Sequence, residues 1–71
     1  MTRAEAYDTA LLLLAKPGLC QGEVALLIEA HETLEPSNWI YDRTLARTIL
    51  LTYPDLYSHI PVAANQNRRQ A

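Results

Sequence analysis

The sequence predicts an all-α protein: a compact three-helix bundle with a short fourth helical turn and a mobile C-terminal tail. Three segments repeat apolar residues with the helical period, and each segment ends at or near a proline. No stretch alternates apolar and polar residues with a period of two, so strands are not expected. We place a single helical domain at residues 1–60 and a flexible polar and basic tail at residues 61–71.

The first predicted helix begins with a capping box, continues to Lys16 and ends at Pro17–Gly18. Thr2 precedes Glu5 by three residues, so that each side chain can bond with the backbone N–H of the other. The helical period places one apolar stripe toward the core, made of Ala4, Tyr7, Leu11, Leu14 and Ala15. Leu12 falls outside this stripe and is expected to face water.

The second predicted helix covers residues 21–34 and ends before Pro36, because the residue before a proline avoids helical backbone angles. Its inner face is expected to carry Val24, Leu27, Ile28, His31 and Leu34. Leu26 lies off this stripe. The segment is acidic, with no lysine or arginine among its glutamates Glu23, Glu29, Glu32 and Glu35. An acidic solvated face is the ordinary explanation, and a site for a basic partner surface is the alternative.

The third predicted helix follows a cap at Ser37 or Asn38 and stops before Pro54. Its inner face is expected to hold Leu45, Ala46, Ile49 and Tyr53. Its outer side is expected to carry Ile40, Arg43, Arg47 and Leu51. One last helical turn is predicted over residues 54–59, with proline at its favoured first position.

The composition limits the classes of function that the chain can perform. A domain of 71 residues leaves no room for a large cofactor or a deep substrate cleft. Six basic against eight acidic residues, a net charge of −2, disfavour a general nucleic-acid or membrane-surface binder. The one cysteine, Cys20, cannot form an intramolecular disulfide and is expected to be a small buried residue. With no signal peptide and no membrane-spanning segment recognised, we expect a cytoplasmic protein.

Residues 31–35, His-Glu-Thr-Leu-Glu, resemble the zinc metalloprotease motif, in which two histidines one helical turn apart bind the metal. Glu35 stands in place of the second histidine, and His59 lies in a separate segment. The sequence therefore favours a partly buried His31 paired with Glu35 over a metal ligand. We expect no metal, no cofactor and no enzymatic activity.

The apolar residues exceed what a small bundle can bury, because each predicted helix contains a run of consecutive apolar residues that wraps around it. Leu12, Leu26 and Leu51 are the expected leftovers, although scattered exposed leucines are normal on protein surfaces. Aromatic residues and arginine beside apolar surface are typical of protein interfaces. The candidate partner-binding residues are Trp39, Ile40, Tyr41, Arg43, Arg47, Leu51 and Leu12, with Arg68 and Arg69 in the tail.

A small acidic helical chain with no catalytic set, surplus surface leucine and a basic tail resembles the small host-takeover proteins of bacteriophages. The resemblance is to those that bind host RNA polymerase and alter initiation or termination, and it covers size and character over the whole chain. It implies a protein partner, no cofactor, and action by occupying or clamping a surface of the polymerase.

A helix-turn-helix DNA-binding transcriptional regulator is the alternative. Residues 21–25 open a helix much as such motifs do, and the third predicted helix carries polar groups that can meet phosphates or base edges, namely Arg43, Thr44, Arg47 and Thr48. The connection through residues 35–37 contains no glycine and is longer than the usual turn. The acidic helix before it also disfavours the approach of DNA.

Overall fold

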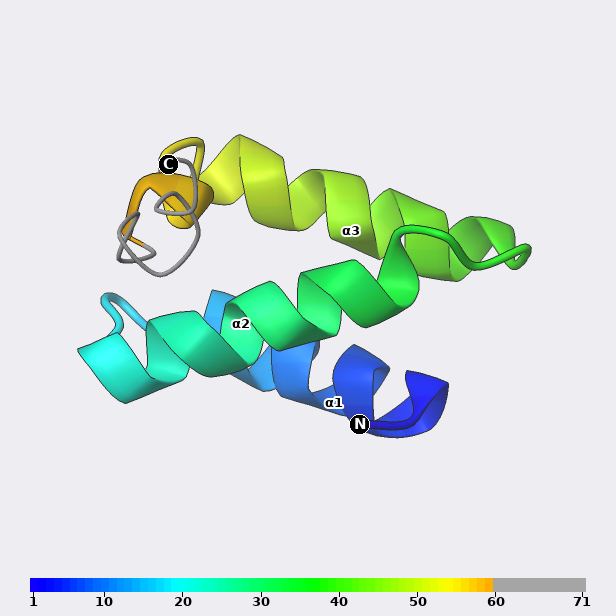
Figure 1. Cartoon of the computed structure of the whole chain (residues 1–71), viewed down its shortest axis with the longest axis horizontal. Coiled ribbons are helices and arrows are strands. Elements are labelled where there is room, and N and C mark those ends of the chain that lie inside the picture. Colours follow the sequence, from blue (N-terminus) through cyan, green and yellow to red (C-terminus); the bar gives the residue numbers. More distant parts are fainter. Residues whose placement is uncertain (60–71) are drawn as a thin grey trace, which may run out of the picture.

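The computed structural model describes residues 1–59, and Figure 1 shows that they form a bundle of helices. The elements are α1 (Arg3–Leu14), α2 (Gln21–Leu34), α3 (Ile40–Thr52) and a 3-10 turn η1 (Leu56–His59). No strand occurs in this part of the chain. The predicted all-α bundle of three helices and a short fourth turn is confirmed. The predicted tail, residues 61–71, lies outside the described residues.

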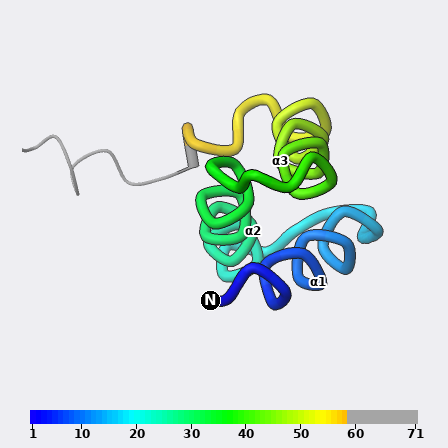
Figure 2. The backbone as a smooth tube through the Cα atoms, turned by 90° about the vertical axis from the view of Figure 1, so that its right-hand side faces the viewer, coloured from blue at the N-terminus to red at the C-terminus, as the bar shows by residue number. Residues whose placement is uncertain are grey.

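The two views agree on how the helices are arranged. α2 and α3 run side by side in opposite directions, and both are seen nearly end-on in Figure 2. α1 crosses beneath them and contacts both, and η1 contacts α2. α2 is therefore the element on which the rest of the bundle assembles.

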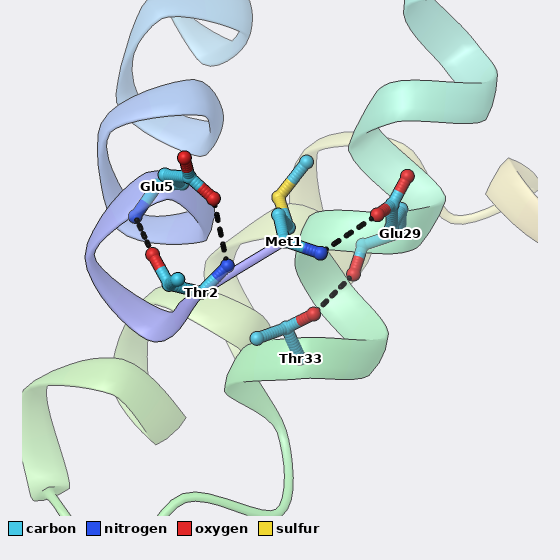
Figure 3. Close-up of polar contacts among 5 residues, drawn as sticks. All are labelled: Met1, Thr2, Glu5, Glu29 and Thr33. Carbon is cyan, nitrogen blue, oxygen red and sulfur yellow. Dashed lines mark hydrogen bonds and ion pairs between the residues drawn. The ribbon is translucent and has the colours of Figure 1, made fainter.

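α1 begins at the predicted capping box, which Figure 3 shows in detail. The Thr2 backbone N–H donates to Glu5 Oε1 at 2.8 Å, and the Glu5 backbone N–H donates to Thr2 Oγ1 at 3.1 Å. The helix ends at Leu14, two residues before the predicted end at Lys16. Two of the backbone N–H groups that α1 cannot satisfy within itself are thus satisfied by side chains.

The predicted inner face of α1 is wrong in part. The buried residues of the helix are Ala6, Ala10 and Leu13, with Tyr7 and Leu14 partly buried beside them. Leu11 is 48% exposed, and Ala4 and Ala15 are also exposed. Four consecutive leucines allow more than one apolar face, and the helix buries the one on which two alanines permit close approach to α2.

α2 covers the predicted residues Gln21–Leu34, and its inner face is confirmed. Leu27, His31 and Leu34 are buried, Val24 and Ile28 are partly buried, and Ala30 joins them. Leu26 is exposed, as predicted. Cys20 is exposed at the N-cap position, so its predicted burial is wrong. Its backbone N–H donates to Glu23 Oε1 at 3.0 Å, and the Glu23 carboxylate also pairs with Lys16.

α3 starts after Trp39, later than the predicted caps at Ser37 and Asn38. Ser37 still contributes, because its hydroxyl accepts a hydrogen bond from the Trp39 backbone N–H at 3.1 Å. The predicted inner face is confirmed: Leu45, Ala46 and Ile49 are buried, and Tyr53 packs partly buried against them. η1 begins at Leu56 and not at Pro54, and Leu56 completes the core.

The first residue of the chain is attached to the middle of α2 (Figure 3). The Met1 ammonium pairs with Glu29 Oε2 at 3.0 Å, and Thr33 Oγ1 donates to the Glu29 backbone oxygen at 2.9 Å. Because the Glu29 side chain is half exposed, we expect this ion pair to contribute at most about 1 kcal/mol.

Core and surface leucines are expected to differ sharply in their effect on stability. Leu27→Ala and Ile49→Ala each remove a fully buried side chain and should lower the free energy of unfolding by about 2–5 kcal/mol. Leu11→Ala should lower it by less than about 1 kcal/mol, because that side chain is half exposed. Urea titration followed by circular dichroism measures all three. An equal loss for Leu11→Ala would contradict the observed face of α1.

The two caps are expected to make stability depend on pH. The hydrogen bond from the Thr2 backbone lowers the pKa of Glu5, and the ion pair with Lys16, followed by the Cys20 backbone N–H, lowers the pKa of Glu23. A carboxylate whose pKa is lower in the folded chain stabilises the fold above its unfolded value of 4.5. That stabilisation is lost as the pH falls through the folded value.

The free energy of unfolding should therefore decline below a pH of about 4.5. Glu5→Gln combined with Glu23→Gln should flatten this decline, whereas Glu32→Gln, at an exposed position, should not. Urea titrations at a series of pH values measure the free energy of unfolding of the wild type and of both variants. The same decline in the capping variant and the wild type would contradict the assignment.

Candidate functional site

The outer face of α3 carries an exposed row of residues that we call the arginine strip: Ile40, Arg43, Arg47 and Leu51. Residues three or four apart lie on the same side of a helix, so the row is continuous. Ile40 is 54% exposed and Leu51 is 75% exposed, and both arginines are exposed between them. The structure thus brings these four predicted residues together on one surface.

The charges of the strip are not neutralised within the described chain. The ion pairs among residues 1–59 involve Lys16, Arg3 and the Met1 ammonium, and none involves Arg43 or Arg47. Two like charges one helical turn apart repel each other slightly. An acidic group from outside these residues would relieve that repulsion.

A groove between α2 and α3 runs beside the strip. This α2–α3 groove has a volume of about 430 Å³ and is lined by His31, Glu35, Arg43, Ala46, Arg47, Leu50 and Leu51. A smaller hollow of about 290 Å³ is lined by Ile40, Arg43, Thr44 and Arg47. Because Arg43 and Arg47 line both, the two guanidinium groups stand on a ridge that separates the groove from the hollow. One wall of the groove therefore carries positive charge, and its far end is apolar.

His31 forms part of the wall of this groove but is engaged inside the protein. It is 6% exposed, and its Nδ1 lies 2.6 Å from the hydroxyl of Tyr57 in η1. The predicted pairing of His31 with Glu35 is therefore wrong, since the partner comes from a segment 26 residues away. Burial raises the pKa of Tyr57, and the carboxylates of Glu32 and Glu35 raise it further. Within residues 1–59, no group of three metal-ligating side chains is placed to hold a metal ion.

Trp39 and Tyr41 are exposed and line neither the groove nor the hollow, and Trp39 packs against α1. The Trp39 ring stacks on Tyr7 of α1 with centroids 6.5 Å apart, and Tyr41 meets its edge at 5.3 Å. The Arg3 guanidinium lies 4.6 Å from the centroid of the Trp39 ring. The structure therefore separates these two predicted residues from the groove.

Leu12, on α1, is 71% exposed and lines neither the groove nor the hollow. Arg68 and Arg69 lie outside the described residues. Among the predicted partner-binding residues of the described chain, those of the arginine strip line the groove or the hollow beside it.

Asp42 is a structurally important residue that the sequence analysis missed. Its carboxylate is fully buried, and Oδ2 accepts hydrogen bonds from Arg3 Nη1 at 3.1 Å and Ser37 Oγ at 2.9 Å. Oδ1 has no hydrogen-bond partner within the described chain. The signal was present, because Asp42 stands at helical spacing from the inner-face residues Leu45, Ala46 and Ile49. Its place in the first turn of α3 suits a negative charge.

Comparison of the chain with protein-family models, curated proteins and solved structures found no match. Within residues 1–59, none of the helices has the length and apolar character needed to cross a membrane. The charges and shape of the surface formed by α2 and α3 are therefore the features from which a function can be inferred.

The contact between Arg3 and Asp42 is expected to stabilise the fold cooperatively. Arg3→Ala leaves the buried carboxylate with Ser37 as its remaining partner and should cost about 1.5–3 kcal/mol. In an Asp42→Asn background, where no buried charge remains, the same change should cost less. Urea titrations of the two single variants and the double variant give the coupling energy. Trp39→Ala, made in the wild type and in the Arg3→Ala variant, measures the contribution of the ring. If the costs of Arg3→Ala and Asp42→Asn simply add in the double variant, the coupling is contradicted.

Proposed function

We propose that this chain is a non-enzymatic regulator that binds an acidic surface of a protein partner through the arginine strip. The observation that carries the proposal is the exposed pair Arg43 and Arg47, one turn apart, with no carboxylate partner within the described residues. Exposed apolar residues stand at both ends of the strip, and hollows lie on both sides of the pair. Arginine beside apolar anchors is the composition of binding hot spots.

The proposed contact uses each part of the strip differently. The planar guanidinium groups of Arg43 and Arg47 can each bind a carboxylate with two parallel hydrogen bonds. Ile40 and Leu51 would lose water to an apolar partner surface, which strengthens the charged contacts between them. The attraction between opposite charges raises the rate of association and selects an acidic partner.

We further propose a host RNA polymerase as the partner, on the resemblance in size and character to small bacteriophage regulators. Binding would occupy or clamp a polymerase surface and so alter transcription. Arg68 and Arg69 would guide the encounter with an acidic surface.

Two observations favour a protein over DNA as the partner of α3. The two helices of a helix-turn-helix meet at about 90–120°, whereas α2 and α3 run side by side in opposite directions (Figures 1 and 2). Thr48 also uses its hydroxyl internally, because it donates to the Thr44 backbone oxygen at 3.0 Å.

Reversing the charge of the strip is expected to weaken partner binding without unfolding the chain. Arg43→Glu combined with Arg47→Glu should reduce the affinity for purified bacterial RNA polymerase at least about tenfold, or about 1.4 kcal/mol. A dye on the exposed thiol of Cys20 reports binding by fluorescence anisotropy. As a control, Gln21→Glu combined with Ala25→Glu lowers the net charge at the start of α2, away from the arginine strip. This variant should change the affinity little.

The same titration with a DNA duplex distinguishes the proposed protein-binding regulator from the alternative, a DNA-binding regulator. A DNA-binding protein would bind the duplex with an affinity that falls steeply as salt rises. Unchanged polymerase affinity in the folded double variant would exclude the arginine strip as the binding surface.

A further inference from the structure

We propose that the α2–α3 groove also binds a second copy of this chain, forming a weak symmetric dimer that covers the arginine strip. This inference rests on the proposed function, since the surface that the dimer hides is the one proposed to bind the partner. Self-association would then regulate how much of the chain is free to bind. The two walls of the groove carry opposite charge, with Glu35 on the α2 side and Arg43 and Arg47 on the α3 side.

The α2 side of the groove carries negative charge that the described residues, 1–59, leave without an ion pair. Glu23 and Glu29, on the same helix, pair with Lys16 and the Met1 ammonium. Glu32 and Glu35 are exposed and form no ion pair with the described residues. Glu35 lines the groove beside His31, and Glu32 lies three residues before Glu35 on α2.

The described arginines, like the glutamates, divide into those that form an ion pair and those that form none with the described residues. Arg3 pairs with Asp42, whereas Arg43 and Arg47 have no such partner among residues 1–59. Glu35 thus lines the groove from the α2 side, and Arg43 and Arg47 line it from the α3 side. No ion pair joins these groups within residues 1–59, and a second copy can bring the opposite charges together.

Symmetry decides which arrangement is favourable. A two-fold axis along the groove lays the α2 side of each copy on the α3 side of the other, so that every contact occurs twice. A two-fold axis across the groove lays glutamates on glutamates and arginines on arginines, which repels. The first arrangement is therefore the one we propose.

The register of the helices fits this arrangement. Because α2 and α3 are antiparallel and joined by a short connection, Glu35 lies near the start of α3 and Glu32 farther along it. Glu35 would face Arg43 of the second copy, and Glu32 would face Arg47. The two glutamates are about 4.5 Å apart along their helix axis and the two arginines about 6 Å, so the spacings nearly match.

The apolar end of the groove gives the dimer a second source of stability. Leu51 is 75% exposed and Leu50 is 38% exposed, and the second copy would cover both. The contact is confined to one groove of a small domain, well below the area of a permanent dimer. A weak dimer is what the regulatory role requires, because an acidic partner can then displace the second copy.

Sedimentation velocity of the full chain over a range of concentrations tests the dimer. We expect the average mass to rise from one chain toward two, and to fall back when salt is added. Glu32→Lys with Glu35→Lys, and Arg43→Glu with Arg47→Glu, should each weaken the dimer at least about tenfold. Mixing these two variants should restore association as a heterodimer. Asp8→Lys with Asp55→Lys changes the net charge by the same amount as Glu32→Lys with Glu35→Lys, but at exposed positions elsewhere, and should leave the dimer intact.

The outcomes separate this inference from the proposed function. A wild-type chain that stays monomeric at every concentration, or a mixture of the two variants that does not associate, overturns the dimer. If Arg43→Glu with Arg47→Glu still weakens polymerase binding, the proposed function remains. A dimer that behaves as expected in a chain that binds no polymerase overturns the proposed partner alone. Glu32→Lys with Glu35→Lys should bind polymerase with no loss of affinity at high chain concentration.

Discussion

The buried carboxylate of Asp42 joins the first turn of α3 to the start of α1 and to the connection between α2 and α3. It accepts one hydrogen bond from Arg3 at the start of α1 and one from Ser37 in the connection between α2 and α3. A charge removed from water is tolerated when its partners replace the lost hydration, so both segments must reach the first turn of α3. Arg3 also lies over the Trp39 ring, which stacks on Tyr7. These contacts hold the start of α3 from the α1 side, and the opposite side is left to form the groove.

The elements of the fold could be predicted because their signals are local. Thr2 and Glu5 mark the start of α1, and the period of apolar residues marks the inner faces of α2 and α3. The inner face of α1 could not be predicted in the same way. Its buried contact with α2 uses alanines such as Ala6 and Ala10, which are valuable for their small size and not for their hydrophobicity. A ranking by hydrophobicity therefore favours Leu11, which the structure leaves half exposed.

The candidate site was predictable only as far as it lies on one helix. The spacing of Arg43 and Arg47 places both on the outer face of α3, which the structure bears out. The groove needs two helices, and its lining joins Glu35 to these arginines through tertiary structure that no local pattern reports. The contact of His31 with Tyr57 is of the same kind. Asp42 differs, because helical spacing alone places it on the inner face of α3. Its burial is easily missed, because charged residues are rarely buried.

The distribution of ion pairs bears on the proposal that the surface beside the groove binds a partner. Exposed ion pairs contribute little to stability, so folding alone does not require Arg43 and Arg47 to find partners. Folding also does not favour placing two arginines and a glutamate that lack ion-pair partners within residues 1–59, together with an exposed leucine, around one hollow. Arg3 shows that this chain can engage a guanidinium with both a carboxylate and an aromatic ring. The arrangement of Arg43 and Arg47 beside exposed Leu51 therefore supports the proposed binding, because each of these groups gains most when another surface removes the water around it.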